Sequence, residues 1–492
     1  MSNNIKVLFI EANRTWLAKG DCLSHLEQIV LPIGLMYLSA SLKTHFKDGV
    51  ETKVISLVVE CKNNEDLDNI LTNYKPDIVG IRGMSIYREA YYEVANRVKY
   101  HNSQTFVIGG GPIATVTPDQ ALSNKNIDCI AIGEGEETIV EVVDRYKERE
   151  SISTIQGIAY RNDDEIIFTK SRPFEEDLNK IAFPDYEAIK LDNYSNVITY
   201  GYNRRKQAVI VSSRGCPYKC IYCHNIHGKK WRSRSADNVY REIRQLYDNY
   251  RISDFYFVDD NVNLNYKRIS AICDLIIESQ IKINIYFANG VRGDILDSQL
   301  IDKMAEAGVI WMTFALETAS PRVQKVIKKD LNLSKLKENI EYACSKNILV
   351  NVCFMIGFPT ETYGDVMETI DFVKNLKSVT IPMIFAAKYY PKTAMYEMAM
   401  ECGSYNNDVL KQAYLDTYHN IHHCQTPWLS SKEAYSLFLI FLRNVFLSKE
   451  RVTNSLVVLR KYYSEEEIKD MYSIFFQKEV KDMEKDVLRY AS

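Results

Sequence analysis

The chain reads Arg-Gly-Cys-Pro-Tyr-Lys-Cys-Ile-Tyr-Cys over residues 214–223, shortly after the apolar run 209–211. Cys216, Cys220 and Cys223 are spaced so that three thiolates can meet on one face of a short loop. Thiolates are soft ligands, and they suit a metal centre such as an iron–sulfur cluster. Three protein ligands, rather than four, leave one iron of a four-iron cluster open to an exogenous ligand.

Zinc is the plainest alternative for these cysteines, with His224 or His227 as the fourth ligand. Structural zinc sites usually combine two short ligand pairs over a longer span, and no second pair follows here. The chain has 11 Cys, an odd number without regular disulfide spacing, and clustered cysteines of a reducing compartment more often bind metal or do redox work. The pattern therefore favours an iron–sulfur cluster over zinc.

Composition indicates an ordinary soluble protein of several domains. With 492 residues, 46% hydrophobic and 25% charged, the chain is too long for a single small binding module and too apolar for long disorder. The net charge of −3 gives no global attraction to nucleic acid or anionic lipid. We see no secretory leader, and the most apolar stretch, 435–442, is too short to span a bilayer. We expect a cytoplasmic protein with no membrane span and no nucleic-acid partner.

Residues 206–402, which contain the cysteine loop, alternate between strand and helix signals. Six or more β/α units of this kind predict a full or partial barrel, whose active site lies at the carboxyl ends of the strands. The strand signals are Ala208–Ser212, Phe255–Val258, Asn284–Ala288, Thr313–Leu316, Val350–Gly357 and Met383–Ala387.

Residues 5 to about 135 carry five strand signals separated by helices, which predicts a doubly wound, Rossmann-like parallel sheet. Ligands of such sheets bind beyond the carboxyl ends of the strands. A G-x-G-x-x-A pattern at Gly109, Gly111 and Ala114 follows a late strand and includes Pro112, so it does not indicate a nicotinamide site. The candidate ligand contacts at these strand ends are Asn13, Ser85, Gly109, Gly110, Gly111, Pro112, Gly133 and Glu134.

These signals divide the chain into four predicted parts. After Gly403 no glycine occurs, and amphipathic helices with capping boxes at Ser430/Glu433 and Ser464/Glu467 are expected. The parts are a Rossmann-like domain over 1–140, a connecting segment over 141–205, the barrel over 206–402 and a helical region over 403–492.

The C-x3-C-x2-C spacing, with Arg-Gly before it and an aromatic residue before the last Cys, resembles the signature of the radical S-adenosylmethionine (SAM) superfamily. Segments 257–261, 289–292, 315–318 and 355–362 resemble the SAM-contacting strand ends of that family. Ala315 and Thr360 stand where glycine is usual. The resemblance implies a partial (β/α)6 barrel, and it implies cluster ligation by the three cysteines. The residues that it places near SAM are Tyr222, Asp259, Asp260, Asn261, Arg292, Glu317 and Gly357.

The N-terminal region resembles the cobalamin-binding (B12-binding) domain of the cobalamin-dependent branch of this superfamily. Segments 32–35, 108–112 and 133–136 carry that likeness. The residues 11–16, where a cobalt-ligating His would stand in the classical cobalamin domain, contain no His. The resemblance therefore implies three cofactors, which are a [4Fe–4S] cluster, SAM and cobalamin. The alternative is that the N-terminal domain is vestigial and binds no cobalamin.

The chemistry implied by the resemblance is methylation of an unactivated carbon of a small molecule or natural-product intermediate. SAM bound to the cluster would yield a 5′-deoxyadenosyl radical, and methylcobalamin would donate the methyl group. An electron donor such as flavodoxin or ferredoxin is expected as a partner. The alternatives are a non-methylating reaction such as ring contraction, cyclisation or another rearrangement, methylthiolation of RNA or protein, and a non-catalytic cobalamin or iron–sulfur sensor.

Overall fold

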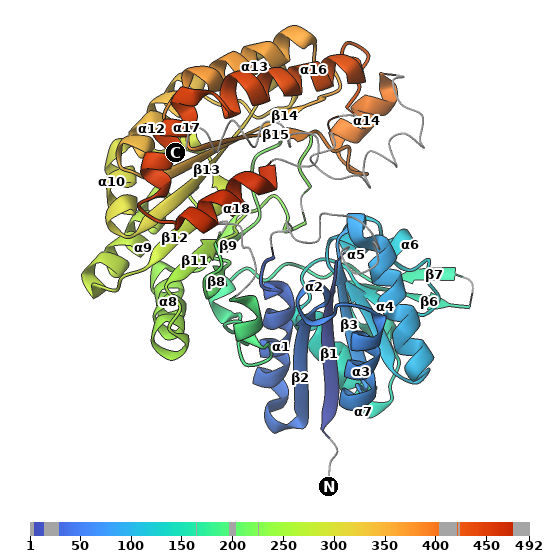
Figure 1. Ribbon diagram of the computed structural model, residues 1–492. Helices are drawn as coiled ribbons and strands as arrows, with labels where there is room; N and C mark the ends of the chain where they lie inside the picture. The colour runs from blue at the N-terminus through green and yellow to red at the C-terminus, as the bar shows by residue number, and fades with distance from the viewer. Residues whose placement is uncertain are drawn as a thin grey trace. The chain divides into compact units, whose positions relative to one another are not determined.

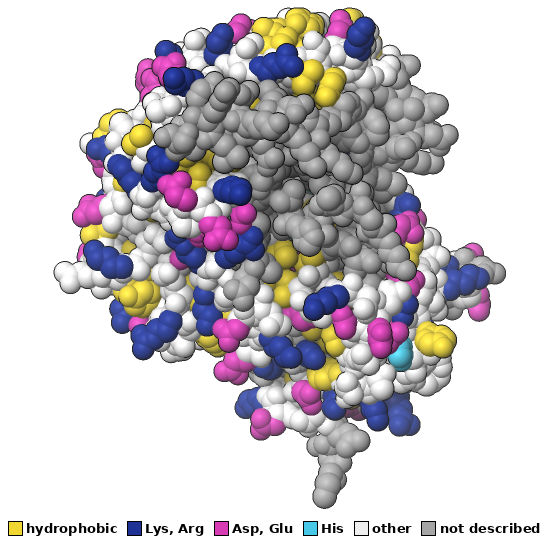
Figure 2. Space-filling view, viewed as in Figure 1, with side chains coloured by type: hydrophobic (Ala, Val, Ile, Leu, Met, Phe, Trp, Pro, Cys, Tyr) yellow, Lys and Arg dark blue, Asp and Glu magenta, His cyan; other side chains and the backbone are white. Residues whose placement is uncertain are grey.

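The computed structural model describes residues 4–13, 29–163, 165–195, 203–224, 226–402, 421 and 424–475. The chain divides into two compact units, an N-terminal unit (Met1–Val197 with Ile226–Gly228) and a barrel unit (Ile198–Asn225 with Lys229–Ser492) (Figure 1). None of the described helices is long and apolar enough to cross a bilayer. Acidic and basic side chains are interspersed on the face seen in Figure 2, which agrees with a net charge close to zero.

The N-terminal unit is built on a seven-stranded sheet with the order β2-β1-β3-β4-β5-β6-β7. β1 to β5 pair in parallel, and the predicted doubly wound α/β sheet is confirmed. The strands are β1 (Ile5–Ala12), β2 (Val50–Ser56), β3 (Ile78–Gly83), β4 (Phe106–Gly110), β5 (Cys129–Ala131), β6 (Ile158–Asn162) and β7 (Glu165–Phe168). The helices are α1 (Ile33–Phe46), α2 (Leu57–Glu60), α3 (Asn64–Tyr74), α4 (Arg88–His101), α5 (Pro112–Val116), α6 (Pro118–Ala121) and α7 (Glu136–Glu148).

Strand β1 shows why this sheet forms. Val7, Leu8, Phe9 and Ile10 are all fully buried, as expected for a parallel strand that is covered by helices on both faces. Helix α3 starts at a side-chain cap, because the side chain of Asn63 accepts a hydrogen bond from the backbone N–H of Asp66.

The structure places part of the predicted connecting segment, residues 141–205, inside the N-terminal unit. β6 and β7 form an antiparallel hairpin that extends the sheet beyond β5. The hairpin turns at Asp163, whose positive φ of 54° is a conformation that Asp tolerates better than most residues. The unit therefore extends past the predicted boundary at residue 140.

The barrel unit contains a six-stranded parallel sheet whose strands follow chain order, with β8 and β15 at its edges. The predicted partial (β/α)6 barrel is confirmed. Its strands are β8 (Gln207–Ile210), β11 (Asp254–Phe257), β12 (Asn284–Val291), β13 (Val309–Glu317), β14 (Leu349–Ile356) and β15 (Ile381–Ala386). Its helices are α8 (Ala236–Tyr250), α9 (Tyr266–Ser279), α10 (Ser298–Glu306), α11 (Pro321–Val326), α12 (Leu333–Ser345), α13 (Tyr363–Asn375) and α14 (Ala394–Glu401).

Two short strands frame the cysteine loop. β9 (Ser213–Arg214) pairs antiparallel with β10 (Arg232–Ser233) just beyond the carboxyl end of β8. The intervening residues 215–231 therefore leave and return to the same end of the barrel, where the strand ends of a parallel sheet gather their ligands.

The described part of the predicted helical region packs on the barrel. It comprises α16 (Ser431–Phe441), a π-helical segment (Leu442–Phe446), α17 (Lys449–Leu459) and α18 (Glu465–Phe475), and α16 contacts α13 (Figure 1). The capping box predicted at Ser430 and Glu433 is present, since each side chain accepts from the other residue's backbone N–H. Residues 403–420, 422–423 and 476–492 of this region lie outside the described residues.

Candidate active site

The three predicted cluster ligands lie on the loop between β9 and β10. Cys216 and Cys220 are half-buried, and Cys223 is exposed. Gly215 has a positive φ of 84°, and its N–H donates to Asp260 Oδ2 at 2.8 Å. Ile221 anchors the middle of the loop, because its N–H donates to the carbonyl of Ile327 at 3.1 Å. The predicted residue Asp260 thus holds the cysteine loop, and its Oδ2 atom is already engaged.

The three thiols are close enough to influence one another. Partial desolvation of the Cys223 sulfur, together with the neighbouring Cys220 and Cys216, raises the pKa of this thiol to about 11 although the residue as a whole is exposed. Burial and Cys220 also raise the pKa of Cys216. Thiols in such a setting become thiolates when a metal centre compensates their charge.

A second cluster of polar groups surrounds Glu317 at the carboxyl end of β13. Glu317 Oε1 accepts hydrogen bonds from the Tyr222 hydroxyl at 3.0 Å and from Lys329 Nζ at 3.1 Å. The backbone of Glu317 has a positive φ of 65°, beside a register shift between β13 and β14. A non-glycine residue in this conformation is unusual and often marks a functional position. Tyr222 lies next to Cys223 in sequence, so this cluster adjoins the cysteine loop.

Lys329 is a site residue that the sequence analysis missed. Burial alone would lower the pKa of its ammonium, but the adjacent Glu317 carboxylate raises the pKa above its usual range. The side chains of Glu317 and Lys329 are 13% and 12% exposed, so the ion pair is well shielded from water. Nothing in the local sequence singles out Lys329, because it meets Glu317 only through the turn that follows α11.

The residues after β11 separate into three roles. Asp259 is buried, and it accepts from the hydroxyls of Ser212 at 2.7 Å and Ser213 at 2.5 Å. Asp260 holds the N–H of Gly215, as described above. The side-chain oxygen of Asn261 is buried and has no hydrogen-bond partner within the described chain. A buried acceptor of this kind needs a donor, so Asn261 is the best placed of the three to meet a bound ligand.

The resemblance places Arg292 near SAM, where its guanidinium would offer two donors to the SAM carboxylate, but the structure gives these donors other partners. Its guanidinium pairs with Asp294 at 2.9 and 3.2 Å, and it donates to the backbone carbonyls of Lys329 and Asp330. Its guanidinium carbon lies 3.9 Å from the ring centroid of Tyr218. To bind the SAM carboxylate, Arg292 would have to give up hydrogen bonds that it already forms. Lys329 provides a second cation, beside Glu317.

The Gly357 loop after β14 is held by buried groups. Gly357 has a positive φ of 100°. Its N–H donates to Glu361 Oε2 at 2.7 Å, and the Phe358 N–H donates to the same oxygen at 3.3 Å. Burial raises the pKa of Glu361 to about 8. The Tyr389 hydroxyl donates to the carbonyl of Gly357. These contacts fix the loop that the resemblance places near SAM.

In the N-terminal unit, packing rather than a ligand explains Gly109. A Cβ atom at Gly109 would lie 1.7 Å from the hydroxyl of Tyr91, which is fully buried. Gly111 has a positive φ of 82°, and a Cβ atom there would lie 2.9 Å from the Arg82 side chain. A Cβ atom at Gly110 would instead meet nothing closer than 3.9 Å. Gly110 therefore leaves the carboxyl end of β4 open to the close approach of a ligand.

The other predicted contacts of this unit take part in local hydrogen bonds. The Asn13 side chain donates to Ser56 Oγ at 3.2 Å and accepts from the Val58 N–H at 3.0 Å. The Gly133 N–H donates to Thr115 Oγ1 at 3.0 Å. Ser85 opens a 3-10 helix, Pro112 is the first residue of α5, and Glu134 accepts from the Glu175 N–H at 3.2 Å.

Two family models match the chain, and they match the two sheets separately. The model of the radical SAM superfamily matches residues 210–373, and the model of the B12 binding domain matches residues 21–143. The first range spans the cysteine loop and the strand ends at Glu317 and Gly357, and the second spans most of the N-terminal sheet.

Similar proteins share this arrangement. The chain is 28% identical over 452 residues to "uncharacterized methyltransferase PH0819" of Pyrococcus horikoshii, which covers 88% of this chain and 94% of the relative. It is also 28% identical over 415 residues to cytidylyl-2-hydroxyethylphosphonate methyltransferase of Streptomyces wedmorensis. This match covers 74% of this chain and 75% of the relative. The chain also superposes with a TM-score of 0.66, at 17% identity, on a solved structure of the radical SAM methyltransferase TsrM from Kitasatospora setae, which has tryptophan and a SAM analogue bound. The superposition covers 81% of this chain and 76% of the TsrM chain.

The sheets, the three-cysteine loop and these matches define a class of protein. The chain combines a radical SAM domain with a B12-binding domain, the pair of domains that cobalamin-dependent radical SAM enzymes carry. The predicted family and its cofactor classes, an iron–sulfur cluster, SAM and cobalamin, are confirmed at the level of the two domains.

Proposed function

We propose that this enzyme methylates an unactivated carbon of a small molecule, with cobalamin as the methyl carrier. The observation that carries the proposal is that the three-cysteine loop and the Tyr222–Glu317–Lys329 cluster adjoin each other at the carboxyl ends of the barrel strands. The N-terminal unit adds a B12-binding domain, and relatives named as methyltransferases support a methyl group as the transferred fragment. A small-molecule substrate and an electron donor of the flavodoxin or ferredoxin type complete the proposal.

The residues of the barrel unit fit the proposed cofactors. Cys216, Cys220 and Cys223 would hold the cluster. Asn261 offers a free acceptor for an amino group, and Glu317, held by Tyr222 and Lys329, offers carboxylate oxygens for hydroxyl groups. When bound, these cofactors supply the one-electron and methyl-transfer chemistry that protein side chains cannot carry out. The chain itself fixes the acceptors, neutralises Glu317 with Lys329 and keeps this ion pair shielded from water.

Transfer of label from SAM tests the proposed methylation. We expect the anaerobically reconstituted protein, given cobalamin, a reductant, methyl-labelled SAM and an extract of host metabolites, to form 5′-deoxyadenosine and one methyl-labelled product. Mass analysis of the extract measures both. Formation of 5′-deoxyadenosine with a changed but unlabelled metabolite would favour the non-methylating alternative. Absence of SAM cleavage with an intact cluster would contradict both enzymatic proposals and favour a sensor.

The Glu317→Ala substitution tests the proposed SAM site. Removing a carboxylate that accepts hydrogen bonds from a bound ligand costs about 1.5–3 kcal/mol, so we expect SAM affinity to fall roughly 10- to 150-fold. Equilibrium binding of SAM to the cluster-loaded protein measures the change. Glu317→Gln, which keeps one acceptor oxygen, should lose less affinity.

Glu338→Ala is the matched control for this test, since Glu338 is an exposed carboxylate on α12. Its SAM affinity should equal that of the native protein. Iron content and the visible absorbance of the cluster should be the same in all the variants. Unchanged SAM affinity in Glu317→Ala would remove Glu317 from the site.

A further inference from the structure

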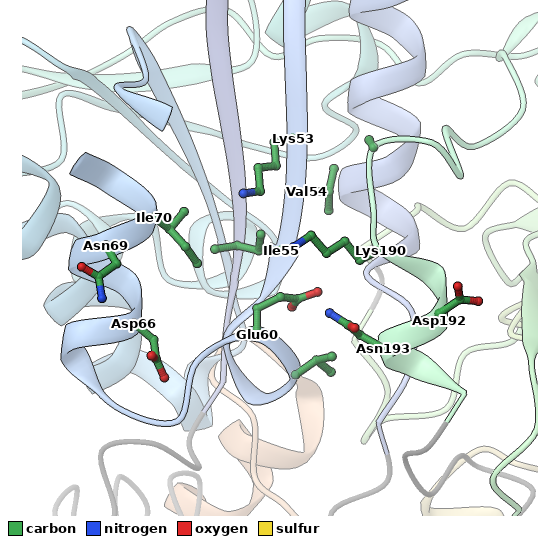
Figure 3. Close-up of a pocket in the computed structure, with 12 residues that line it drawn as sticks. Lys53, Val54, Ile55, Glu60, Asp66, Asn69, Ile70, Lys190, Asp192 and Asn193 are labelled. Atoms are coloured by element: carbon green, nitrogen blue, oxygen red, sulfur yellow. The ribbon is translucent and has the colours of Figure 1, made fainter. Parts of the chain in front are cut away.

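The N-terminal unit contains a cavity that neither the proposed chemistry nor the predicted cobalamin contacts use. It has a volume of about 510 Å³ and lies beside the edge strand β2 (Figure 3). β2, α2 and α3 form one side, and residues 188–193 form the other. The two sides are joined by a backbone hydrogen bond, in which the Val54 N–H donates to the carbonyl of Ala188 at 2.9 Å. A volume of this size suits a small metabolite.

Two lysines supply positive charge to this cavity. Lys53 projects from β2 and Lys190 from the facing segment, and both point into the same space in Figure 3. Within the described chain, neither ammonium forms an ion pair or a hydrogen bond. Burial lowers the pKa of Lys53, repulsion by the charge of Lys190 lowers it further, and the negative charge of Glu60 raises it. An anion between them would remove that repulsion.

Glu60 adds an acceptor that lacks a donor. Its Oε2 atom accepts from the Ser56 N–H at 2.8 Å and lies 3.5 Å from the Tyr194 hydroxyl. Its Oε1 atom is buried and has no hydrogen-bond partner within the described chain. Burial raises the pKa of Glu60 to about 7. A buried carboxylate oxygen without a donor is unfavourable, and a ligand hydroxyl would satisfy it.

We propose that this cavity binds a small organic anion that also carries a hydroxyl group. Lys53 and Lys190 bind its phosphate or carboxylate, and the hydroxyl donates to Glu60 Oε1. Ile55 and Ile70 line the same cavity and cover the carbon skeleton. The site is separate from the open backbone at Gly110, because β4 lies three strands away from β2, about 14 Å at the usual strand spacing. The proposal goes beyond the proposed function and does not depend on catalysis.

Binding of two defined probes to the full-length, cofactor-loaded protein tests this site. Glycerol 3-phosphate represents the phosphate source, malate represents the carboxylate source, and glycerol is the neutral control. We expect saturable binding of at least one anion by calorimetry and none of glycerol. The double substitution Lys53→Met/Lys190→Met should weaken that binding at least tenfold. Lys62→Met, which removes an exposed lysine outside the cavity, should leave it unchanged.

The preference between the two anions identifies the acidic group that the site takes. The thermal midpoint and cobalamin content of each variant report on folding, so a loss of binding in a folded double variant supports the site. Binding of neither anion, equal binding in the double variant, or equal binding of glycerol would overturn the proposal. Binding of the anion to cobalamin-free protein alone would also overturn it, because the cavity would then belong to the cobalamin site.

Discussion

Replacing Cys216, Cys220 or Cys223 by Ala is expected to abolish the iron–sulfur cluster and, with it, all cleavage of SAM. Each thiolate would hold a different iron, and the pKa values of Cys216 and Cys223 stay raised although the nearby charge of Lys229 lowers them, so the cluster would supply the positive charge that the three thiolates need. Iron should fall from about four atoms per chain to less than one, because a cluster of this kind depends on its thiolate ligands. Iron analysis and the visible absorbance of anaerobically purified protein measure the loss.

Cys344→Ala is the matched control for these substitutions. Cys344 is also a half-buried free cysteine, but it lies on α12 rather than on the cysteine loop. Its iron content and SAM cleavage should match those of the native protein. An intact cluster in a variant with all three cysteines replaced by Ala would refute the assignment of Cys216, Cys220 and Cys223 as its ligands. Stoichiometric zinc in the native protein would restore the zinc alternative.

The parts of the fold that the sequence predicts are those with local causes. The run Val7–Ile10 is apolar at every position and forms a fully buried parallel strand. Cys216, Cys220 and Cys223 fall within eight residues, so one short loop brings them together whatever the rest of the chain does. The capping box at Ser430 and Glu433 is likewise complete within four residues.

The roles of individual site residues depend on contacts between distant segments, and the sequence does not reveal these. Arg292 looks available in the sequence, yet Asp294 and two backbone carbonyls use its donors. Lys329 has no recognisable motif, yet it pairs with Glu317. Gly109 lies in a glycine-rich loop that suggests a ligand, yet its lack of a side chain makes room for Tyr91. In each case the contacting residue comes from another segment of the chain, so the contact can be identified only in the folded structure.

The helical region after residue 403 carries no family resemblance in its sequence, and Arg451 on α17 shows how part of this region is attached to the barrel. Arg451 is 3% exposed, and its guanidinium donates to four backbone carbonyls. The bonds run to Val373, Leu376 and Val379, each at 2.9 Å, and to Val445 at 3.1 Å. The carbonyl of Val373 belongs to the last turn of α13, where a cation also complements the helix dipole.

Arg451→Met is therefore expected to destabilise the protein by about 3–5 kcal/mol, because each buried carbonyl left without a donor costs about 1–3 kcal/mol and removal of the buried charge offsets part of that cost. Methionine keeps most of the volume but none of the donors, so the four carbonyls lose their partner. Urea unfolding of the barrel unit measures the change. Arg443→Met, an exposed position on the neighbouring π-helical segment, is the control and should change stability by less than about 0.5 kcal/mol.

Arg451→Lys discriminates between charge and geometry as the source of this stability. Lysine keeps the positive charge at the end of α13, but it cannot reach all four carbonyls at once because it has a single nitrogen. We expect it to recover only part of the loss. Equal stability of Arg451→Met and Arg443→Met would show that the helices after residue 424 add nothing to the barrel. A large loss would make them part of the barrel's own core, because Arg451 joins α17 to the end of α13, the helix that follows the Gly357 loop.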